Sequence, residues 1–369
     1  MSGTARPPLV VGVPRETKPG EHRVALTPDS VAELRAHGVT VLVERDAGAD
    51  SSITNDAFGA AGARIVDRAE DVWERAELVV KVKEPQDPEH RFLRPGLVLF
   101  TYLHLAAYPD VAGALLARGV TAIGYETVQE ASGALPLLAP MSEVAGRMAP
   151  QIGAHFLERE PGGRGVLLGG VPGVAPAKVV VLGAGAVGWN AARVASGMGA
   201  DVRVVDRAVE RLRTIDEVTD GRVRTFASNR AAIERLVLDA DLLIGAVLVA
   251  GGRAPVLVSE DLVRAMRPGS VVVDVAVDQG GCIATTHETS HADPVYERHG
   301  VLHYAVGNMP GAVPHTSTYA LTNATLPYVV ALATLGVDGA TARDPALALG
   351  VNTRDGAVVN AVVATALTG

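Results

Sequence analysis

The sequence predicts an α/β protein with two domains, each built on a parallel β-sheet. Short apolar segments typical of strands alternate with helical segments up to Tyr125, and a second such series starts at Lys178. A glycine fingerprint opens this second series, so about half of the chain precedes it. With 369 residues, of which 48% are hydrophobic, the chain is long and apolar enough for two cores.

The first series begins with a predicted strand at residues 10–13 and a helix. Thr27-Pro28-Asp29 supplies an N-cap, a proline at the first helical position and an early acid, and Gly38 ends the helix. Further strands are predicted at residues 39–43, 78–83, 97–103 and 120–125. Because helical stretches separate these strands, we expect the sheet to be parallel.

A helix that starts near Ser142 is the predicted bridge between the two domains. Ser142 is the expected N-cap, and Val144, Met148 and Ile152 recur every four residues. The glycine-rich residues 162–173 then lead into the second series. Its predicted elements are strands at residues 179–182, 242–249, 271–277 and 303–306, and a tail helix at 318–334.

The fingerprint Gly183-Ala-Gly185-Ala-Val-Gly188 indicates a dinucleotide site. It joins the strand at 179–182 to a helix predicted over 186–198, where glycines allow a tight turn and close approach to a pyrophosphate. Asp206 ends the next strand, eighteen residues after Gly188. Its carboxylate would accept hydrogen bonds from ribose hydroxyls and repel a 2′-phosphate, so NAD is favoured over NADP. Arg207 weakens that preference slightly.

The composition argues against several classes of partner. The net charge is −8, the pI is about 5.7 and there is no basic run, so nucleic acid and anionic membrane surfaces are not expected to bind. No uninterrupted apolar run reaches the roughly eighteen residues of a membrane helix, and no signal peptide is evident. Cys282 is the only cysteine, which excludes an internal disulfide. The cytoplasm is the expected location.

Polar residues at the ends of the predicted strands are the first candidates for chemistry, because ligands of parallel sheets bind there. Lys81 and Lys83 lie on one face of their strand, so either would meet a substrate anion or simply be solvated. His104 is a candidate acid–base group or a structural histidine. Asp278 precedes two glycines within a few residues and is also a typical turn aspartate. Arg23, in the loop after the first strand, is otherwise a surface arginine.

Several blocks of sequence in the right order resemble alanine dehydrogenases, in the superfamily that includes the nucleotide-binding part of nicotinamide nucleotide transhydrogenase. The likeness runs nearly end to end. The blocks are Val11-Gly-Val-Pro-Arg-Glu-Thr-Lys-Pro-Gly-Glu-His-Arg-Val-Ala-Leu-Thr-Pro28, Lys81-Val-Lys-Glu-Pro85, Leu103-His-Leu-Ala106, Tyr125-Glu-Thr-Val-Gln129, Leu138-Ala-Pro-Met-Ser-Glu-Val-Ala-Gly146, Asp278-Gln-Gly-Gly-Cys282 and Asn308-Met-Pro.

The resemblance implies a fold, a reaction and a set of site residues. The implied fold has two Rossmann-like, doubly wound domains with the active site in the cleft between them. They are a substrate domain of residues 1–137 completed by 312–369, and a NAD-binding domain of residues 138–311. The implied reaction is the oxidation of L-alanine to pyruvate and ammonia, and its reverse, with glycine and glyoxylate as further candidates. Most members like this chain are homohexamers.

The residues carried over from the family fall into three groups. Arg23 and Lys83 match the residues that hold the substrate carboxylate. His104 and Asp278 match the catalytic pair, whose proton steps we leave unassigned. The expected cofactor contacts are Ser142, Gly183, Gly185, Ala186, Val187, Gly188, Asp206, Arg211, Ser228, Val247, Leu248, Val275, Asn308 and Met309.

Departures from the family pattern limit these expectations. Gly20 stands where asparagine is common, and Val187 where alanine is common in the glycine motif. Some members bind magnesium through an acid and a histidine on the tail helix, but this chain has Ala331 and Leu335 there, so no metal is expected. Two other functions stay open: a transhydrogenase-type module that delivers hydride to another nucleotide, and a NAD-sensing binding protein without turnover.

Overall fold

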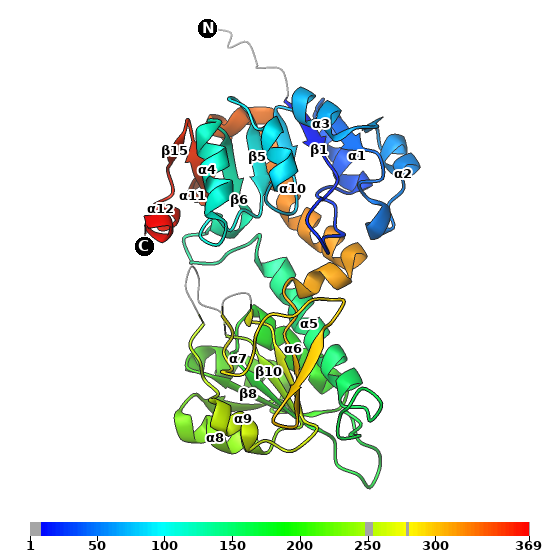
Figure 1. Cartoon of the computed structure of the whole chain (residues 1–369), viewed down its shortest axis with the longest axis vertical. Helices are drawn as coiled ribbons and strands as arrows, with labels where there is room; N and C mark the ends of the chain where they lie inside the picture. The colour runs from blue at the N-terminus through cyan, green and yellow to red at the C-terminus, as the bar shows by residue number, and fades with distance from the viewer. Residues whose placement is uncertain (1–8, 248–253, 278–279, 369) are drawn as a thin grey trace. The chain divides into compact units, whose positions relative to one another are not determined.

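The computed structural model describes residues 9–247, 254–277 and 280–368, and it contains two compact units (Figure 1). The first unit comprises Met1–Met141 and Gly311–Gly369, and the second comprises Ser142–Pro310. The division therefore falls inside one helix, α5 (Ala139–Phe156), after Met141. The C-terminal segment returns to the first unit, where it lies beside the strands of the N-terminal half in Figure 1.

The first unit is built on an eight-stranded sheet in the order β15-β14-β6-β5-β4-β1-β2-β3. Its first six strands in sequence are all parallel and have the Rossmann order 3-2-1-4-5-6, whereas β14 and β15 are antiparallel. The strands are β1 (Val10–Val13), β2 (Thr40–Glu44), β3 (Arg64–Val66), β4 (Leu78–Val80), β5 (Val98–Thr101), β6 (Thr121–Gly124), β14 (Val351–Arg354) and β15 (Ala357–Val358).

Helices flank this sheet and connect its parallel strands. Thr27 caps the first helix as predicted, since its hydroxyl accepts a hydrogen bond from the Ser30 amide at 3.3 Å and Pro28 is the first helical residue. The helices are α1 (Pro28–Ala36), α2 (Asn55–Ala60), α3 (Ala69–Arg75), α4 (Pro109–Ala117), α10 (Pro314–Arg343), α11 (Pro345–Gly350) and α12 (Ala361–Thr368), with 3-10 turns η1 (Ala49–Ser51), η2 (Asp87–Phe92) and η3 (Tyr125–Thr127).

Helix α10 is long and apolar enough to cross a membrane by length and composition alone. Its backbone is interrupted at Gly336, which has φ 69° and ψ 175°, a conformation essentially restricted to glycine. Its buried residues include Thr318, Leu321 and Val329, and the helix packs against α1, α11, η1 and β4. We therefore interpret α10 as a packed helix of the first unit, longer than the predicted 318–334.

The second unit contains a seven-stranded sheet in the order β12-β13-β11-β10-β7-β8-β9. All pairs are parallel except β12 with β13, so this sheet also has the Rossmann order, with one antiparallel edge strand that the sequence did not predict. The strands are β7 (Lys178–Leu182), β8 (Asp201–Asp206), β9 (Arg224–Ala227), β10 (Leu242–Gly245), β11 (Val271–Asp274), β12 (Val295–Arg298) and β13 (Val301–Tyr304).

Both faces of this second sheet are covered, as a doubly wound fold requires. Alternate residues of β7 point to opposite faces: Val179 and Val181 belong to one buried cluster with Ala191 of α6, while Val180 belongs to another with Ile233 of α8. The α/β prediction with two doubly wound domains is thus confirmed. The helices of this unit are α6 (Ala186–Gly197), α7 (Val209–Thr219), α8 (Arg230–Leu238) and α9 (Glu260–Arg264), and η5 (Met309–Ala312) runs into the first unit.

Two local predictions that bear on candidate site residues were wrong, and β10 and β11 end at Gly245 and Asp274, before the predicted residues 249 and 277. Ser142 is not an N-cap, because α5 already begins at Ala139 and Ser142 lies within it. The strand expected at 78–83 ends at Val80, so Lys81 and Lys83 follow the strand and do not share a strand face. After Val80 the Glu16 carboxylate, and not a neighbouring strand, accepts the amides of Val82 and Lys83, while α5 already begins three residues before Ser142.

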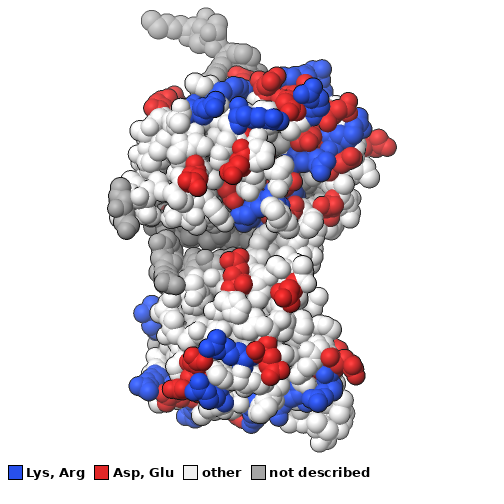
Figure 2. Space-filling model, viewed as in Figure 1, with Lys and Arg blue, Asp and Glu red and all other residues white. Residues whose placement is uncertain are grey.

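Acidic and basic side chains alternate on the face of the molecule shown in Figure 2, and no area of a single sign stands out there. Many of these charges form ion pairs, such as Arg230 with Glu234 and Arg91 with Glu70. Exposed pairs of this kind contribute little to stability, about 0–1 kcal/mol each. Their mixture is consistent with the expectation of a small-molecule ligand.

Candidate active site

Three candidate site residues of the first unit follow neighbouring strands of its sheet. Arg23 lies in the loop after β1, Lys83 follows β4 and His104 follows β5. Because β1, β4 and β5 are adjacent and parallel, their carboxyl ends meet at one edge of the sheet, next to the point where the strand order reverses. The structure therefore brings Arg23, Lys83 and His104 to the same edge.

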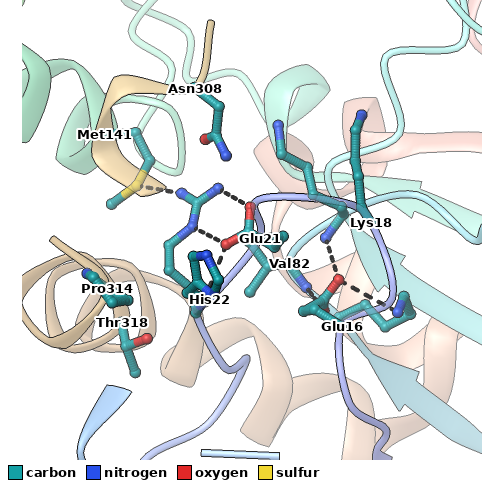
Figure 3. A network of polar contacts seen from close by, with 12 residues as sticks. Glu16, Lys18, Glu21, His22, Val82, Met141, Asn308, Pro314 and Thr318 are labelled. Carbon is teal, nitrogen blue, oxygen red and sulfur yellow. Dashed lines mark hydrogen bonds and ion pairs between the residues drawn. The ribbon is translucent and has the colours of Figure 1, made fainter. Parts of the chain in front are cut away.

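Arg23 is buried and is held by a glutamate two residues before it. Its Nε and Nη2 atoms donate to the Glu21 carboxylate at 2.6 and 2.5 Å, and Nη1 contacts the Met141 sulfur at 2.8 Å (Figure 3). Burial opposes ionisation of Glu21, but the guanidinium outweighs it and lowers the pKa of Glu21 to about 2. Arg23 and Glu21 thus form a charge-neutral buried pair, and a substrate carboxylate would bind the guanidinium by a different edge.

The two lysines after β4 have different surroundings. Lys81 is fully buried, with its ammonium 2.9 Å from Glu89 and 3.3 Å from Glu16. Burial works against its charge, but these carboxylates outweigh burial and raise the pKa of Lys81. Two acids surrounding one cation leave no need for a substrate anion, so Lys81 is the structural lysine of the pair.

Lys83, by contrast, forms no ion pair with any residue that the structure describes. Its ammonium lies 6.0 Å from the centre of the Tyr102 ring, within cation–π range. Burial and the neighbouring Arg23 charge lower the pKa of Lys83. A partly buried ammonium that forms no ion pair is a group that a small organic anion would neutralise.

A glutamate from the loop after β1 holds the backbone at Lys83. Glu16 accepts hydrogen bonds from the amides of Val82 at 2.7 Å and Lys83 at 3.3 Å, as Figure 3 shows for Val82. Burial, only partly offset by Lys81, raises the pKa of Glu16 to about 6. Glu16 therefore links the loop of Arg23 to that of Lys83.

His104 has an unusual backbone conformation and an aromatic support. Its φ angle is 46°, in the left-handed region, which histidine adopts more readily than most residues. Its amide donates to Glu126 Oε1 at 2.6 Å, and its ring stacks on Tyr102 with centroids 5.7 Å apart. In turn, the Tyr102 hydroxyl donates to the Leu137 carbonyl at 2.6 Å. The imidazole nitrogens have no hydrogen-bond partner among the described residues.

Lys18 connects the same loops on their outer side. Its ammonium lies 2.5 Å from Glu84, which follows Lys83, and 3.0 Å from the hydroxyl of Tyr108, which follows His104. Sequence reasoning missed Lys18 and the glutamates at 16, 21 and 126 as candidates. The available signal was their position: all lie in loops after strands whose carboxyl ends share one edge, within or beside blocks that carry the resemblance.

In the second unit, the geometry of the glycine fingerprint fits a dinucleotide. Gly183 has φ 107°, and a Cβ there would lie 2.6 Å from the Ala246 carbonyl oxygen. A Cβ at Gly188 would lie 1.8 Å from the Gly183 carbonyl oxygen, so α6 approaches the turn as closely as glycine allows. A Cβ at Gly185 would be 3.9 Å from the Arg211 guanidinium, an ordinary van der Waals distance, and no side chain caps α6. The first amides of α6 are therefore available to a diphosphate.

Ala186 and Val187 lie in the first turn of α6, and Ser142 lies in α5, which packs on α6. Gly146, one turn after Ser142, packs so closely on α6 that a Cβ there would lie 2.3 Å from the Val187 carbonyl oxygen. Arg147 Nε also donates to Asn190 Oδ1 at 2.9 Å. The expected cofactor contact Ser142 is thus placed on a helix that packs against the fingerprint helix.

Asp206 ends β8 beside the fingerprint. Its two carboxylate oxygens accept from the amides of Ala184 at 2.6 Å and Ala208 at 2.7 Å, which fixes the side chain at the turn. Ser228 donates its amide to the Asp206 carbonyl, and the Arg211 guanidinium lies 3.9 Å from the position of a Cβ on Gly185. These residues surround the same helix N-terminus.

The remaining cofactor candidates follow the strands on the other side of β7. Val247 comes after β10, Val275 after β11, and Asn308 and Met309 after β13. These strands are parallel to β7, so all four residues lie at the carboxyl edge of the sheet. Leu248 and Asp278 lie outside the described residues. Among the residues that the structure does describe, no cluster of three or more His, Cys, Asp or Glu could hold a metal ion.

Two family models cover this chain almost completely. Residues 12–145 match the alanine dehydrogenase/PNT N-terminal domain, and residues 149–361 match the alanine dehydrogenase/PNT C-terminal domain. The chain belongs to the alanine dehydrogenase/PNT family. The alanine dehydrogenase of Mycolicibacterium smegmatis is 55% identical over 96% of this chain and 96% of the relative. That of Bacillus subtilis is 54% identical over 96% of this chain and 94% of the relative.

Solved structures of this family have the same fold. A structure of L-alanine dehydrogenase is similar with a TM-score of 0.95 at 52% identity, covering 98% of this chain and 99% of that one. A transhydrogenase structure from Sinorhizobium meliloti gives a TM-score of 0.82 at 25% identity, covering 95% and 99%. Both branches of the alanine dehydrogenase/PNT family therefore share the architecture. The overall fold does not tell the two branches apart, so the distinction depends on the site residues.

The close approach of α6 to the fingerprint turn predicts that Gly188→Ala weakens NADH binding. The added Cβ must push α6 away from Gly183, and we expect about a tenfold or greater loss of affinity, ~1.4 kcal/mol. Gly197→Ala, at the other end of α6, is the matched control because nothing lies within 4 Å of its Cβ position. Titration of NADH fluorescence, with circular dichroism to verify folding, measures both. Equal affinities in the two folded variants would contradict the interpretation.

Proposed function

We propose that this chain is a NAD-dependent alanine dehydrogenase that oxidises L-alanine to pyruvate and ammonia and catalyses the reverse reductive amination. The observation that carries the proposal is the 55% identity to an alanine dehydrogenase over nearly the whole of both chains. The edge that holds Arg23, Lys83 and His104 suits a small anionic substrate. We further propose a substrate domain of residues 1–137 and 312–369, which falls within the first unit, and a NAD-binding domain of residues 138–311, which contains the second unit.

Binding of the substrate carboxylate is assigned to Lys83 and Arg23. Because Glu21 neutralises Arg23, Lys83 supplies the positive charge that the substrate balances. Arg23 adds directional hydrogen bonds from a guanidinium whose plane Glu21 and Met141 fix. Since both groups lie in fixed loops, they would hold the carboxylate of alanine or pyruvate in one orientation, as hydride transfer needs.

His104 and Asp278 are assigned the proton steps. Oxidation of the substrate requires loss of a proton from its ammonium group and of a hydride from Cα, and the iminium that remains must be attacked by water. A neutral His104 imidazole, with no hydrogen bond to the described part of the chain, is able to accept a proton from the amine or from that water. Asp278 is proposed to hold the amine or orient the water because it matches the family residue. The order of the two roles stays open.

We place the NAD site in the second unit. When bound, NAD supplies the nicotinamide ring that accepts hydride from Cα. The amides at the start of α6 and Ser142 would hold the diphosphate, while Asp206 would accept ribose hydroxyl hydrogen bonds. The Asp206 charge would repel a 2′-phosphate, which favours NAD over NADP.

We also propose a homohexamer in the cytoplasm. The hexamer follows from the family resemblance, and the exposed apolar residues Leu167, Val171 and Val174 support self-association. They are 66%, 52% and 63% exposed and lie in one glycine-rich segment of the second unit. The sole cysteine is buried, in keeping with a reducing compartment.

A transhydrogenase-type module is the second candidate, favoured by the structural match to the Sinorhizobium protein. Such a module passes hydride between nucleotides and needs no amino-acid site. The Lys83 ammonium lies near Arg23 and forms no ion pair with a described residue. This argues against the transhydrogenase-type module, because removing a charge from water is costly unless a ligand supplies the counter-charge.

The proposed activity predicts turnover in both directions. L-Alanine with NAD should produce NADH, and pyruvate with ammonium should consume it, as measured by absorbance of the reduced nicotinamide. Glycine and glyoxylate test the substrate range in the same assay. A folded sample that binds NADH but turns over neither pair would contradict the proposal and leave a NAD-binding protein without turnover, or a transhydrogenase-type module if it transfers hydride between nucleotides.

Asp206→Ala should raise the KM for NAD and reduce the preference for NAD over NADP. The substitution removes both the ribose acceptor and the charge that repels a 2′-phosphate. Asp216→Ala, on the exposed face of α7, removes the same charge elsewhere and should leave the preference unchanged. Steady-state kinetics with both nucleotides measures the ratio. An unchanged ratio in Asp206→Ala would assign the choice to another residue.

Lys83 and His104 should affect different kinetic constants. Lys83→Ala should weaken pyruvate binding by about 10- to 100-fold, since a hydrogen bond to a charged group contributes about 1.5–3 kcal/mol. His104→Ala should lower kcat by about 10²–10⁴ with little change in pyruvate affinity. Binding of pyruvate to the NADH complex without ammonium, and kcat in the full assay, separate the two effects.

A pH series adds a second test of Lys83. Since the pKa of Lys83 is lowered, its charge is present at low pH and is lost as pH rises through that pKa, earlier than for an ordinary lysine. Pyruvate affinity should therefore fall with rising pH in the wild type but not in Lys83→Arg, which stays charged.

If His104→Ala keeps kcat within a few-fold of wild type in a folded protein, His104 is structural.

A further inference from the structure

The backbone at His104 is held from outside its own loop. Strand β5 ends at Thr101, and the Tyr102 amide still donates to the Val82 carbonyl at 3.2 Å. The next two amides find a carboxylate: Leu103 lies 3.2 Å from both oxygens of Glu126, and His104 lies 2.6 Å from Oε1. Glu126 thus accepts hydrogen bonds from the first two amides after β5 that have no partner in the sheet.

Glu126 makes no ion pair within the described part of the chain. Its carboxylate accepts hydrogen bonds from the backbone amides of Leu103 and His104. A carboxylate that accepts backbone amides forms charge-assisted bonds, about twice as strong as neutral ones. This strength offsets the cost of the left-handed φ of 46° at His104, a conformation that L-residues seldom adopt.

The base of Glu126 is fixed in place. It lies in η3, directly after β6, and a Cβ on the preceding Gly124 would come within 3.2 Å of Glu126 Oε1 and 2.7 Å of Asn352 Nδ2. Thr127 Oγ1 also lies 2.8 Å from Asn352 Oδ1 in β14. The C-terminal strand therefore braces the short segment that carries Glu126.

We propose that Glu126 is a positioning residue for the reaction: it holds the His104 backbone in the left-handed conformation that lays the imidazole on the Tyr102 ring and presents it for proton transfer. The inference rests on the proposed function, in which His104 moves the proton. Tyr102 fixes the plane of the imidazole, while Glu126 fixes the point on the backbone from which it extends. Without Glu126, His104 would relax to an ordinary φ and its ring would move.

A double-mutant cycle tests this proposal. Glu126→Ala should lower kcat by about 10- to 100-fold, because a displacement of about 1 Å at a reacting group costs up to 10²-fold. The pyruvate KM should stay within a few-fold, since Lys83 and Arg23 belong to other loops. Glu126→Gln keeps one amide acceptor and should recover part of kcat. In the His104→Ala background, Glu126→Ala should cause no further loss.

The control variant is Glu130→Ala, and each contrary outcome identifies which proposal fails. Glu130→Ala, an exposed glutamate four residues later, should match wild type, and the melting temperature and NADH affinity report on folding. Equal further loss from Glu126→Ala with and without His104 would overturn the inference, as would a raised pyruvate KM with unchanged kcat. If His104→Ala lowers kcat but Glu126→Ala does not, only this inference fails. If His104→Ala keeps kcat, the proposed role of His104 fails as well.

Discussion

In the first unit, several backbone amides that follow strands β4 and β5 have no hydrogen-bond partner in the sheet. Glutamate carboxylates accept the hydrogen bonds of these amides. Glu126, after β6, accepts the amides of Leu103 and His104, which follow the neighbouring strand β5. Glu16, after β1, accepts those of Val82 and Lys83, which follow the neighbouring strand β4. The two outer strands therefore supply the acceptors for the two inner loops, which carry Lys83 and His104.

The same edge also has a specific charge balance. Glu21 pairs with Arg23, and Glu16 with Glu89 surrounds Lys81, whereas Lys83 forms no ion pair with a described residue. Buried charges without a partner are costly, and proteins retain them where a ligand provides the counter-charge. A substrate carboxylate would thus give Lys83 the ion-pair partner that no described residue provides.

Prediction from sequence succeeded where a single segment decides the outcome. Thr27 caps its helix and the fingerprint glycines form the strand-to-helix turn, because each depends on residues a few positions apart. Prediction failed at Ser142, which lies inside α5, and at the strand that ends at Val80. The distinction between Lys81 and Lys83 also could not be predicted, since it depends on Glu16, more than sixty residues away in the chain.

The sequence by itself determined the α/β architecture, the dinucleotide fingerprint, Asp206 as the acid at the end of the second strand, and the family resemblance that named Arg23, Lys83, His104 and Asp278. These features are read from local spacing, because strand, turn and helix preferences act over short distances. The tertiary structure alone decided which lysine stays unneutralised, how Glu21 occupies one edge of Arg23 and how Glu126 holds His104. Burial and hydrogen bonding between loops decide these, and loops become neighbours only when the strands that precede them pair in the sheet.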